Sequence, residues 1–182
     1  MNKKKSSVTL LISILFFLLA SPVFAEDTTP IYIGVEPRIG REDWYQDGEY
    51  DVNVIPLVIE FALSDNISFK TKTSYFMHYG GSVGSKRSLV GIGGNVFYHF
   101  KPISDSRQYH GLFLGPLLES NYDYIEAMRH STIAAEVGYA IPVDTDWSVN
   151  ISAQYGRTNF SDATKPTADH FGIFVNFGYW LF

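Results

Sequence analysis

The chain has 182 residues, no cysteine and a formal net charge of −5 at pH 7. A length of this order corresponds to one domain. Acidic residues outnumber basic ones by 19 to 14, which leaves no basic stripe for phosphates and argues against nucleic-acid binding. Because disulfides are excluded, stability has to come from packing and backbone hydrogen bonds.

The first 25 residues have the pattern of a cleaved export signal. Lysines occupy positions 3–5, residues 8–20 form an apolar core, and Val23-Phe24-Ala25 matches a small-x-small cleavage site. The apolar core is shorter than the roughly 20 residues that a membrane-spanning helix needs. We therefore expect a signal peptide over residues 1–25, cleavage after Ala25, and a mature domain over residues 26–182.

Period-two alternation of apolar and polar residues recurs about eight times after the signal. It is clearest in residues 147–158, where Trp147, Val149, Ile151, Ala153 and Tyr155 alternate with small or polar residues. The expected strands are residues 31–40, 52–63, 67–79, 89–100, 109–119, 131–142, 147–158 and 169–182. Mostly short turns at 64–66, 102–108 and 144–146 alternate with longer polar connections at 41–51, 80–88, 120–130 and 158–168. This rhythm predicts an up-and-down barrel with both termini at the periplasmic end.

Alternation alone leaves two barrels open: a soluble lipocalin-like barrel with its apolar face inward, and a membrane barrel with that face outward. Three features favour the membrane: aromatic residues near strand ends, a polar face that mixes small residues with opposite charges, and an aromatic C-terminus. The sequence therefore predicts an all-β protein, an eight-stranded antiparallel up-and-down transmembrane β-barrel in the bacterial outer membrane. We expect a monomer without a cofactor, surrounded by outer-membrane lipids and lipopolysaccharide.

The mature chain, with its alternating segments and its last strand HFGIFVNFGYWLF, resembles the small eight-stranded outer-membrane proteins of Gram-negative bacteria. That group includes the OmpA transmembrane domain and the OmpX-like barrels. The resemblance implies that the barrel-assembly machinery reads the last strand, with Trp180 and Phe182 as the assembly signal.

Two features depart from a regular barrel. The stronger apolar set of the last strand is offset by one residue from Trp180 and Phe182, so we expect a bulge near Gly178. Pro37, Pro56 and Pro116 each remove a donor from a strand ladder, and bulges or strand ends are expected there.

Seven charged residues fall on the predicted lumen face. An eight-stranded barrel is just wide enough for its own side chains, so opposite charges inside it must pair. We expect at least one ion pair between Lys70 or Lys72 and Glu60 or Glu136. A structural plug of salt bridges is favoured over a gate in a narrow pore. The lumen set comprises Glu36, Arg38, Glu60, Lys70, Lys72, Glu119 and Glu136.

No motif assigns catalytic residues or a metal centre. His130-Ser131 with Glu136 is the only local trio suited to the ester hydrolysis of lipid A deacylases, and neighbouring strand residues point to opposite faces. His78 and His170 could instead approach Ser161 or Asp169 near the rim.

The acidic loop over residues 41–51 has two interpretations, divalent-cation binding or plain solvation. Its carboxylates are Glu42, Asp43, Asp47, Glu49 and Asp51. The leading function hypothesis is a non-enzymatic barrel that contributes to envelope integrity or surface interaction. A lipid A modifying enzyme and a narrow pore remain the alternatives.

Overall fold

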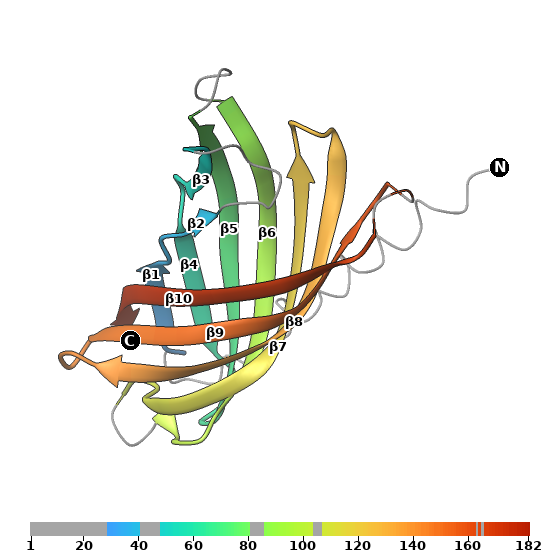
Figure 1. The fold of residues 1–182 in the computed structure, drawn as a ribbon. Helices are drawn as coiled ribbons and strands as arrows, with labels where there is room; N and C mark the ends of the chain where they lie inside the picture. The colour runs from blue at the N-terminus through green and yellow to red at the C-terminus, as the bar shows by residue number, and fades with distance from the viewer. Residues whose placement is uncertain (1–28, 41–47, 81–85, 104–106, 163, 165) are drawn as a thin grey trace.

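The computed structural model of the chain is a closed antiparallel β-barrel (Figure 1). It describes residues 29–40, 48–80, 86–103, 107–162, 164 and 166–182. The predicted signal peptide and its cleavage site lie outside the described residues. Among the described residues, no helix is long and apolar enough to cross a membrane.

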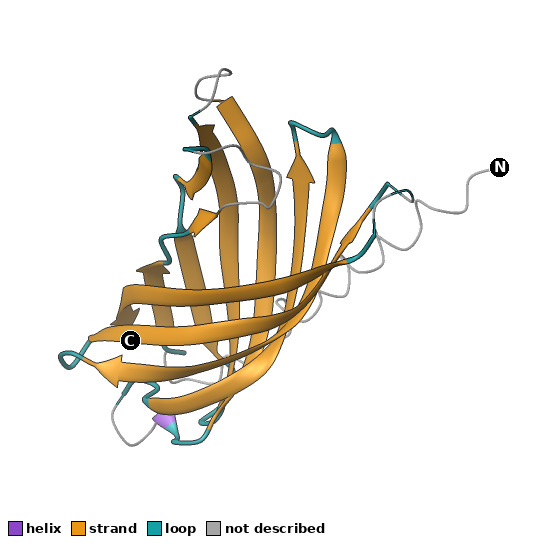
Figure 2. Ribbon diagram, viewed as in Figure 1, coloured by secondary structure: helices purple, strands orange, loops and turns teal. Residues whose placement is uncertain are grey.

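Figure 2 shows that strands make up most of the described chain. The segments are β1 (Ile31–Val35), β2 (Ile39–Gly40), β3 (Tyr50–Asn53), β4 (Leu57–Ala62), β5 (Ile67–Tyr79), β6 (Lys86–His99), β7 (Gly111–Asp123), β8 (Met128–Pro142), β9 (Trp147–Phe160) and β10 (Ala168–Leu181). β1 with β2 and β3 with β4 are interrupted halves of single strands, so these segments build eight barrel strands. Pairing of β1 with β10 and of β5 with β6 closes the sheet. The predicted fold class is confirmed.

Two of the three prolines fall where strands are interrupted. Pro37 separates β1 from β2, and Pro56 separates β3 from β4. Across the second gap the inward face shifts by one residue, since Asn53 and Val58 are both buried. The side-chain amide of Asn53 provides hydrogen-bond partners for backbone groups near this gap. It donates to the Thr73 carbonyl and accepts from the Ile55 and Tyr75 N–H groups. The expected strand ends at these two prolines are confirmed.

The expectation at Pro116 is wrong. β7 runs through this residue, which pairs with Ala135 of β8. Only the ladder to β6 is affected: it skips Val96 and Phe97 and resumes in the same register. The missing proline N–H therefore removes two residue pairs from the β6–β7 ladder and causes no bulge.

The expected bulge near Gly178 is also wrong. β10 is regular there, with Gly178 opposite Gly34 and its neighbours in step. A Cβ on Gly178 would lie 2.5 Å from both the Gly34 Cα and the Tyr32 ring, so the glycine provides space under that ring. Trp180 is consequently buried in the lumen, whereas Phe182 is exposed.

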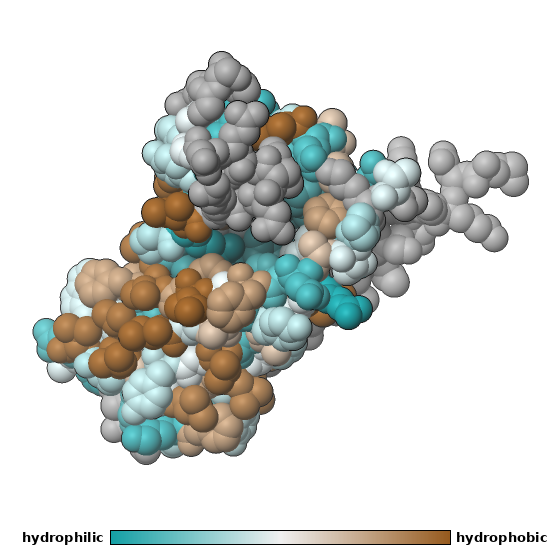
Figure 3. Space-filling view, in the orientation of Figure 1, coloured by the Kyte–Doolittle hydropathy of each residue, from teal (hydrophilic) through white to brown (hydrophobic). Residues whose placement is uncertain are grey.

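The distribution of side chains is inverted relative to a soluble protein. Large apolar residues such as Ile133, Phe171 and Ile173 are exposed by 59%, 69% and 69%, while Lys72 and Glu136 are exposed by only 1%. Figure 3 shows hydrophobic residues gathered over the outer wall. An apolar exterior around a polar interior is the arrangement of a transmembrane barrel and excludes the lipocalin-like alternative.

The two ends of the barrel differ from the expected rhythm. β7 and β8 extend further than predicted and leave a tight turn over residues 124–127, so the expected long connection at 120–130 is wrong. At the other end, the described residues 101–103 and 107–110 contact the neighbouring turns: the Ile103 N–H donates to the Asp65 carbonyl, and the Gln108 amide donates to the Asp144 carbonyl. We call this second end, where Ile31 pairs with Leu181, the closed end, and the opposite end the rim.

The outward face of β9 yields a stability prediction. Ile151 is 46% exposed midway along β9, whereas the next residue, Ser152, is buried in the lumen. Ile151→Arg should lower the free energy of unfolding by about 2–4 kcal/mol, because the cation lies near the bilayer midplane. The measurement is urea unfolding in bilayers of decreasing thickness, which should relieve the penalty.

Ser152→Arg is the matched control. Its cost comes from crowding in the lumen and should not vary with bilayer thickness. A thickness dependence confined to Ser152→Arg would mean that the faces are assigned the wrong way round.

Candidate functional site

The lumen holds a network of charged side chains from five strands of the barrel wall. All seven residues of the predicted lumen set lie inside the barrel, and each is at least nine-tenths buried as a side chain. Three cations, Arg38, Lys70 and Lys72, face four carboxylates. At this degree of burial the charges interact with one another more than with solvent.

Arg38 lies toward the rim side of the network and joins two carboxylates. Its Nη2 atom is 3.0 Å from Glu36 Oε1, and its Nη1 atom is 3.5 Å from Glu119 Oε2. The guanidinium also lies 5.2 Å from the centre of the Phe174 ring. Arg38 thereby links the first barrel strand to β7 and β10.

Lys70 forms the shortest ion pair of the network. Its Nζ atom donates to Glu136 Oε1 at 2.9 Å, and Glu36 Oε2 lies 3.7 Å away. The second oxygen of Glu136 accepts from the Asn95 amide at 2.9 Å and from the Gln154 amide at 2.6 Å. This is an ion pair of the kind the sequence predicts, and it crosses the lumen from β5 to β8.

Lys72 occupies the centre of the network. Its Nζ atom is 3.6 Å from Glu36 Oε1 and 3.7 Å from Glu119 Oε2, so one ammonium serves two carboxylates. Glu119 is also held by the Ser74 hydroxyl at 3.0 Å and the Asn121 amide at 2.9 Å. The positive charges of the set are therefore distributed over shared carboxylates.

Glu60 belongs to a different cluster from the one expected. Its Oε1 atom accepts from the Ser68 hydroxyl at 2.6 Å and lies 3.3 Å from His99 Nε2. Ser68 Oγ is in turn 2.9 Å from the same His99 nitrogen. Sequence analysis missed this trio, because its members come from three strands and no local spacing joins them.

The Ser68–His99–Glu60 trio does not have the geometry of a hydrolytic triad. In such a triad the acid orients the imidazole from one nitrogen while the serine uses the other. Here serine and carboxylate both meet Nε2, and Nδ1 has no hydrogen-bond partner among the described residues. The trio is a buried hydrogen-bond cluster.

Tyr109 covers this cluster from the closed end. Its ring stacks on His99 at 3.7 Å between centroids, with 6° between the planes. Its hydroxyl donates to the Ser64 and Ile67 carbonyls, the latter at 2.9 Å. Burial, together with the nearby Glu60 and Asp65 carboxylates, raises the pKa of the Tyr109 phenol, so it remains a neutral donor.

An apolar cluster seals the same end. Tyr32, Val58 and Ala62 of the first two barrel strands pack with Ile103, Tyr109 and Trp180. The hollow between this cluster and Lys70 has no room for a water-sized sphere. The predicted assembly residue Trp180 is thus part of the seal.

The other histidine and serine candidates do not come together. His130 approaches Asp123 while Ser131 is exposed on the opposite face, as neighbouring strand residues must be. His78 pairs with Asp51 at 3.1 Å, and His170 Nε2 is 3.2 Å from the Gln154 amide oxygen.

The remaining rim candidates point elsewhere. Ser161 caps the Arg129 backbone through hydrogen bonds in both directions. Asp169 lies 3.9 Å from Arg157 on the outer wall. Of the acidic loop, Glu42, Asp43 and Asp47 lie outside the described residues.

Fold and surface together define the class: a small eight-stranded β-barrel of the outer-membrane type. No protein-family model matches the chain, and no curated protein does. Among solved structures, the chain is similar to the crystal structure of Ail, the attachment invasion locus protein of Yersinia pestis, with a TM-score of 0.49 and 13% identity, covering 84% of this chain and 97% of Ail. A second structure, Ail in complex with the heparin analogue sucrose octasulfate, gives a TM-score of 0.47 and 10% identity with the same coverage. This likeness concerns the chain architecture, and no residue role is carried over from Ail.

The two carboxylates Glu136 and Glu60 give a paired stability prediction. Glu136→Gln should lower the free energy of unfolding by about 3–5 kcal/mol, because Lys70 loses its closest counter-charge inside the lumen. Glu60→Gln should cost only about 1–2 kcal/mol, since Ser68 and His99 are hydrogen-bonding neighbours that an amide still satisfies. Urea midpoints of the two refolded barrels test this order. Equal midpoints for both variants and wild type would show that the lumen charges are solvated.

Tyr109 gives a prediction for the closed end. Tyr109→Phe keeps the stacked ring but removes the donor to two carbonyls, so unfolding should become easier by about 1–3 kcal/mol. The control is Tyr139→Phe on the outer wall, where the same deletion should change stability by less than about 0.5 kcal/mol. If both substitutions behave alike, the phenol hydrogen bonds do not stabilise the closed end.

Proposed function

We propose that this protein is a non-enzymatic outer-membrane barrel that supports the cell envelope and offers its rim for surface interaction. The observation that carries the proposal is the filled lumen, in which an ion-pair network is sealed at one end by the Tyr109 cluster. Such an interior supports rigidity and a fixed shape. The outward-facing apolar wall is then the surface that meets lipid.

The filled lumen argues against a narrow pore. Lys72, Glu136 and Gln154 are each exposed by only 1%. Gln154 donates to Glu136, and Lys72 lies between the Glu36 and Glu119 carboxylates. Water or ions could pass only if pairs such as Lys70–Glu136 opened, at a cost of several kcal/mol. Barrels of eight strands have interiors just wide enough for side chains, which agrees with this packing.

A lipid A modifying enzyme is disfavoured by the placement of the nucleophile candidates. Acyl chains reach a barrel from its outer wall, where an enzyme needs a hydroxyl next to a base. The hydroxyl–histidine contact between Ser68 and His99 lies deep in the lumen and under Tyr109. A lipid would have no access to it.

The outer wall supports contact with membrane lipids, including lipopolysaccharide. Aromatic residues lie near both ends of the wall: Trp147, Phe177 and Tyr179 toward the closed end, Tyr155 and Phe171 toward the rim. Amphipathic rings prefer the headgroup level, so these positions fit two interfacial belts. Phe182 remains our proposed contact for the barrel-assembly machinery, together with the Trp180 strand.

The experiment compares three properties of cells and protein. Refolded protein in a planar bilayer should give no stepwise conductance, and lipid A masses should be identical in cells with and without the gene. Loss of the gene should sensitise cells to detergent with chelator. Conductance steps would favour the pore, and an altered acyl content of lipid A would favour the enzyme.

Lys72→Met serves as a control for the conductance test. It removes the central cation and should destabilise the network, so leakage confined to this variant would show that ion pairing closes the lumen. Conductance by the wild type equal to that of the variant would contradict the proposal.

A further inference from the structure

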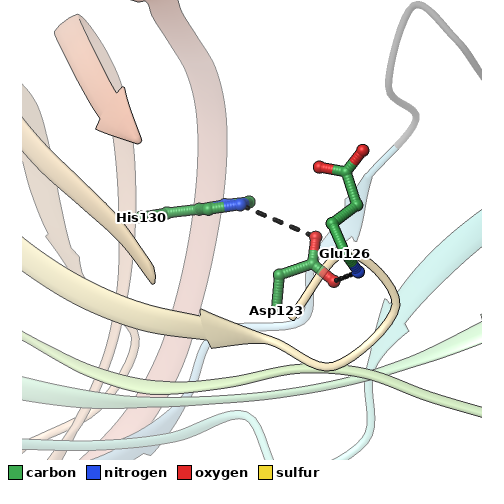
Figure 4. A group of neighbouring side chains, drawn as sticks. All are labelled: Asp123, Glu126 and His130. Carbon is green, nitrogen blue, oxygen red and sulfur yellow. Dashed lines mark hydrogen bonds and ion pairs between the residues drawn. The ribbon is translucent and has the colours of Figure 1, made fainter. Parts of the chain in front are cut away.

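The turn between β7 and β8 brings three metal-binding side chains together at the rim (Figure 4). Asp123 is the last residue of β7, Glu126 lies within the turn, and His130 is the third residue of β8. Asp123 pairs with Met128 and Asn121 with His130, so Asp123 and His130 are diagonal neighbours on the inward face of the ladder. Side chains in that relation are within reach of one another.

The distance between His130 and Asp123 fits two ligands of a shared ion better than a direct hydrogen bond. One donor atom from each residue lies within 4.8 Å of the other two. His130 Nε2 is 3.6 Å from Asp123 Oδ2, which is longer than a hydrogen bond. Two ligand atoms bound to one tetrahedral zinc ion at roughly 2.0–2.1 Å are separated by about 3.4 Å. The observed separation is therefore close to that of two ligands on one ion.

The surrounding contacts orient the side chains of Asp123 and His130. Asp123 Oδ1 accepts the Ile125 N–H at 2.7 Å and the Glu126 N–H at 2.9 Å, which holds the carboxylate with Oδ2 toward His130. The Phe160 ring packs edge-on against the imidazole at 4.9 Å between centroids. Outer contacts of this kind fix the orientation of ligands in metal sites.

The backbone of the turn between β7 and β8 is held by one left-handed residue and by a hydrogen bond to β6. Ala127 has a φ of 53°, a left-handed conformation that lets the chain reverse within residues 124–127. Tyr124 N–H donates to the Ser88 carbonyl of β6, which ties the turn to the next strand. The three side chains are consequently displayed by a short, hydrogen-bonded turn.

The chemistry of the donors selects the metal. An imidazole nitrogen with two carboxylates favours zinc or a similar first-row divalent ion, whereas calcium and magnesium prefer oxygen ligands alone. The two carboxylates balance the charge of the ion. Three protein ligands leave a fourth position for water, as in zinc sites that exchange a ligand.

We propose that Asp123, Glu126 and His130 form a zinc site at the rim of the barrel. With three protein ligands, its fourth position is available to water or to a ligand atom from another molecule. Neither the charged lumen nor the proposed envelope role requires this site. The zinc proposal is therefore tested independently of the proposed function.

The test is calorimetric titration of zinc chloride into chelator-treated, refolded full-length mature protein in detergent. Wild type should bind one zinc ion per barrel. Asp123→Asn and His130→Gln should each weaken binding by at least ~100-fold, since even outer-shell changes cost 10–100-fold. Asp123→Asn retains an oxygen that can accept the turn N–H groups, so a correctly folded barrel is expected.

His170→Gln is the matched control, because it removes another rim-side imidazole, the one next to Gln154, and leaves the trio intact. It should bind zinc as wild type does, and calcium chloride should not compete. Cobalt substitution gives a second readout, since its visible spectrum should change in His130→Gln and not in His170→Gln. Unchanged zinc affinity in His130→Gln, equal loss in His170→Gln, or no binding by the wild type would overturn the proposal.

Discussion

Closure of the sheet is the constraint on which the rest of the structure depends. A lipid environment offers no hydrogen-bond partners for backbone N–H and C=O groups, so the strands must bond to one another. The pairing of β5 with β6 closes the sheet into a barrel. Eight strands also set a narrow interior. Side chains that alternate inward have to fill that space, and charged ones such as Lys72 have to find counter-charges within it.

The ion pairs follow from closure, yet their main effect need not be added stability. A buried pair regains little more than the cost of removing its charges from water, whereas a broken pair is severely unfavourable. Because a slip of one residue moves every side chain to the other face, it would put Lys70 in lipid and leave Glu136 alone. The network therefore penalises wrong registers, which suits a barrel whose outer wall is mostly apolar.

Structural features that depend on local alternation could be predicted from the sequence. Features that depend on contacts between residues far apart in the chain could not. β5 and β9 were assigned almost residue by residue, and the inward face of β5 placed Lys70 and Lys72 in the lumen. The tight turn over residues 124–127 was missed because β7 continues past the apolar zone with polar residues, so its alternation no longer looks like a strand. The Tyr109 cover on His99 has no sequence signal at all. The bulge expected at Gly178 came from assuming that Trp180 faces lipid, whereas a cluster with Tyr32 and Tyr109 draws it inward.

These features restrict where the protein can carry out chemistry with other molecules. A ligand entering the lumen would have to separate pairs such as Lys70–Glu136 and displace the Tyr109 seal, at a cost of several kcal/mol before any new contact forms. A ligand at the rim meets no such cost, since side chains there are held by their own turn, as Asp123 is by the Ile125 and Glu126 N–H groups. The rigid barrel thus acts as a support that fixes the rim, and recognition of other molecules is expected at the rim and along the outer wall.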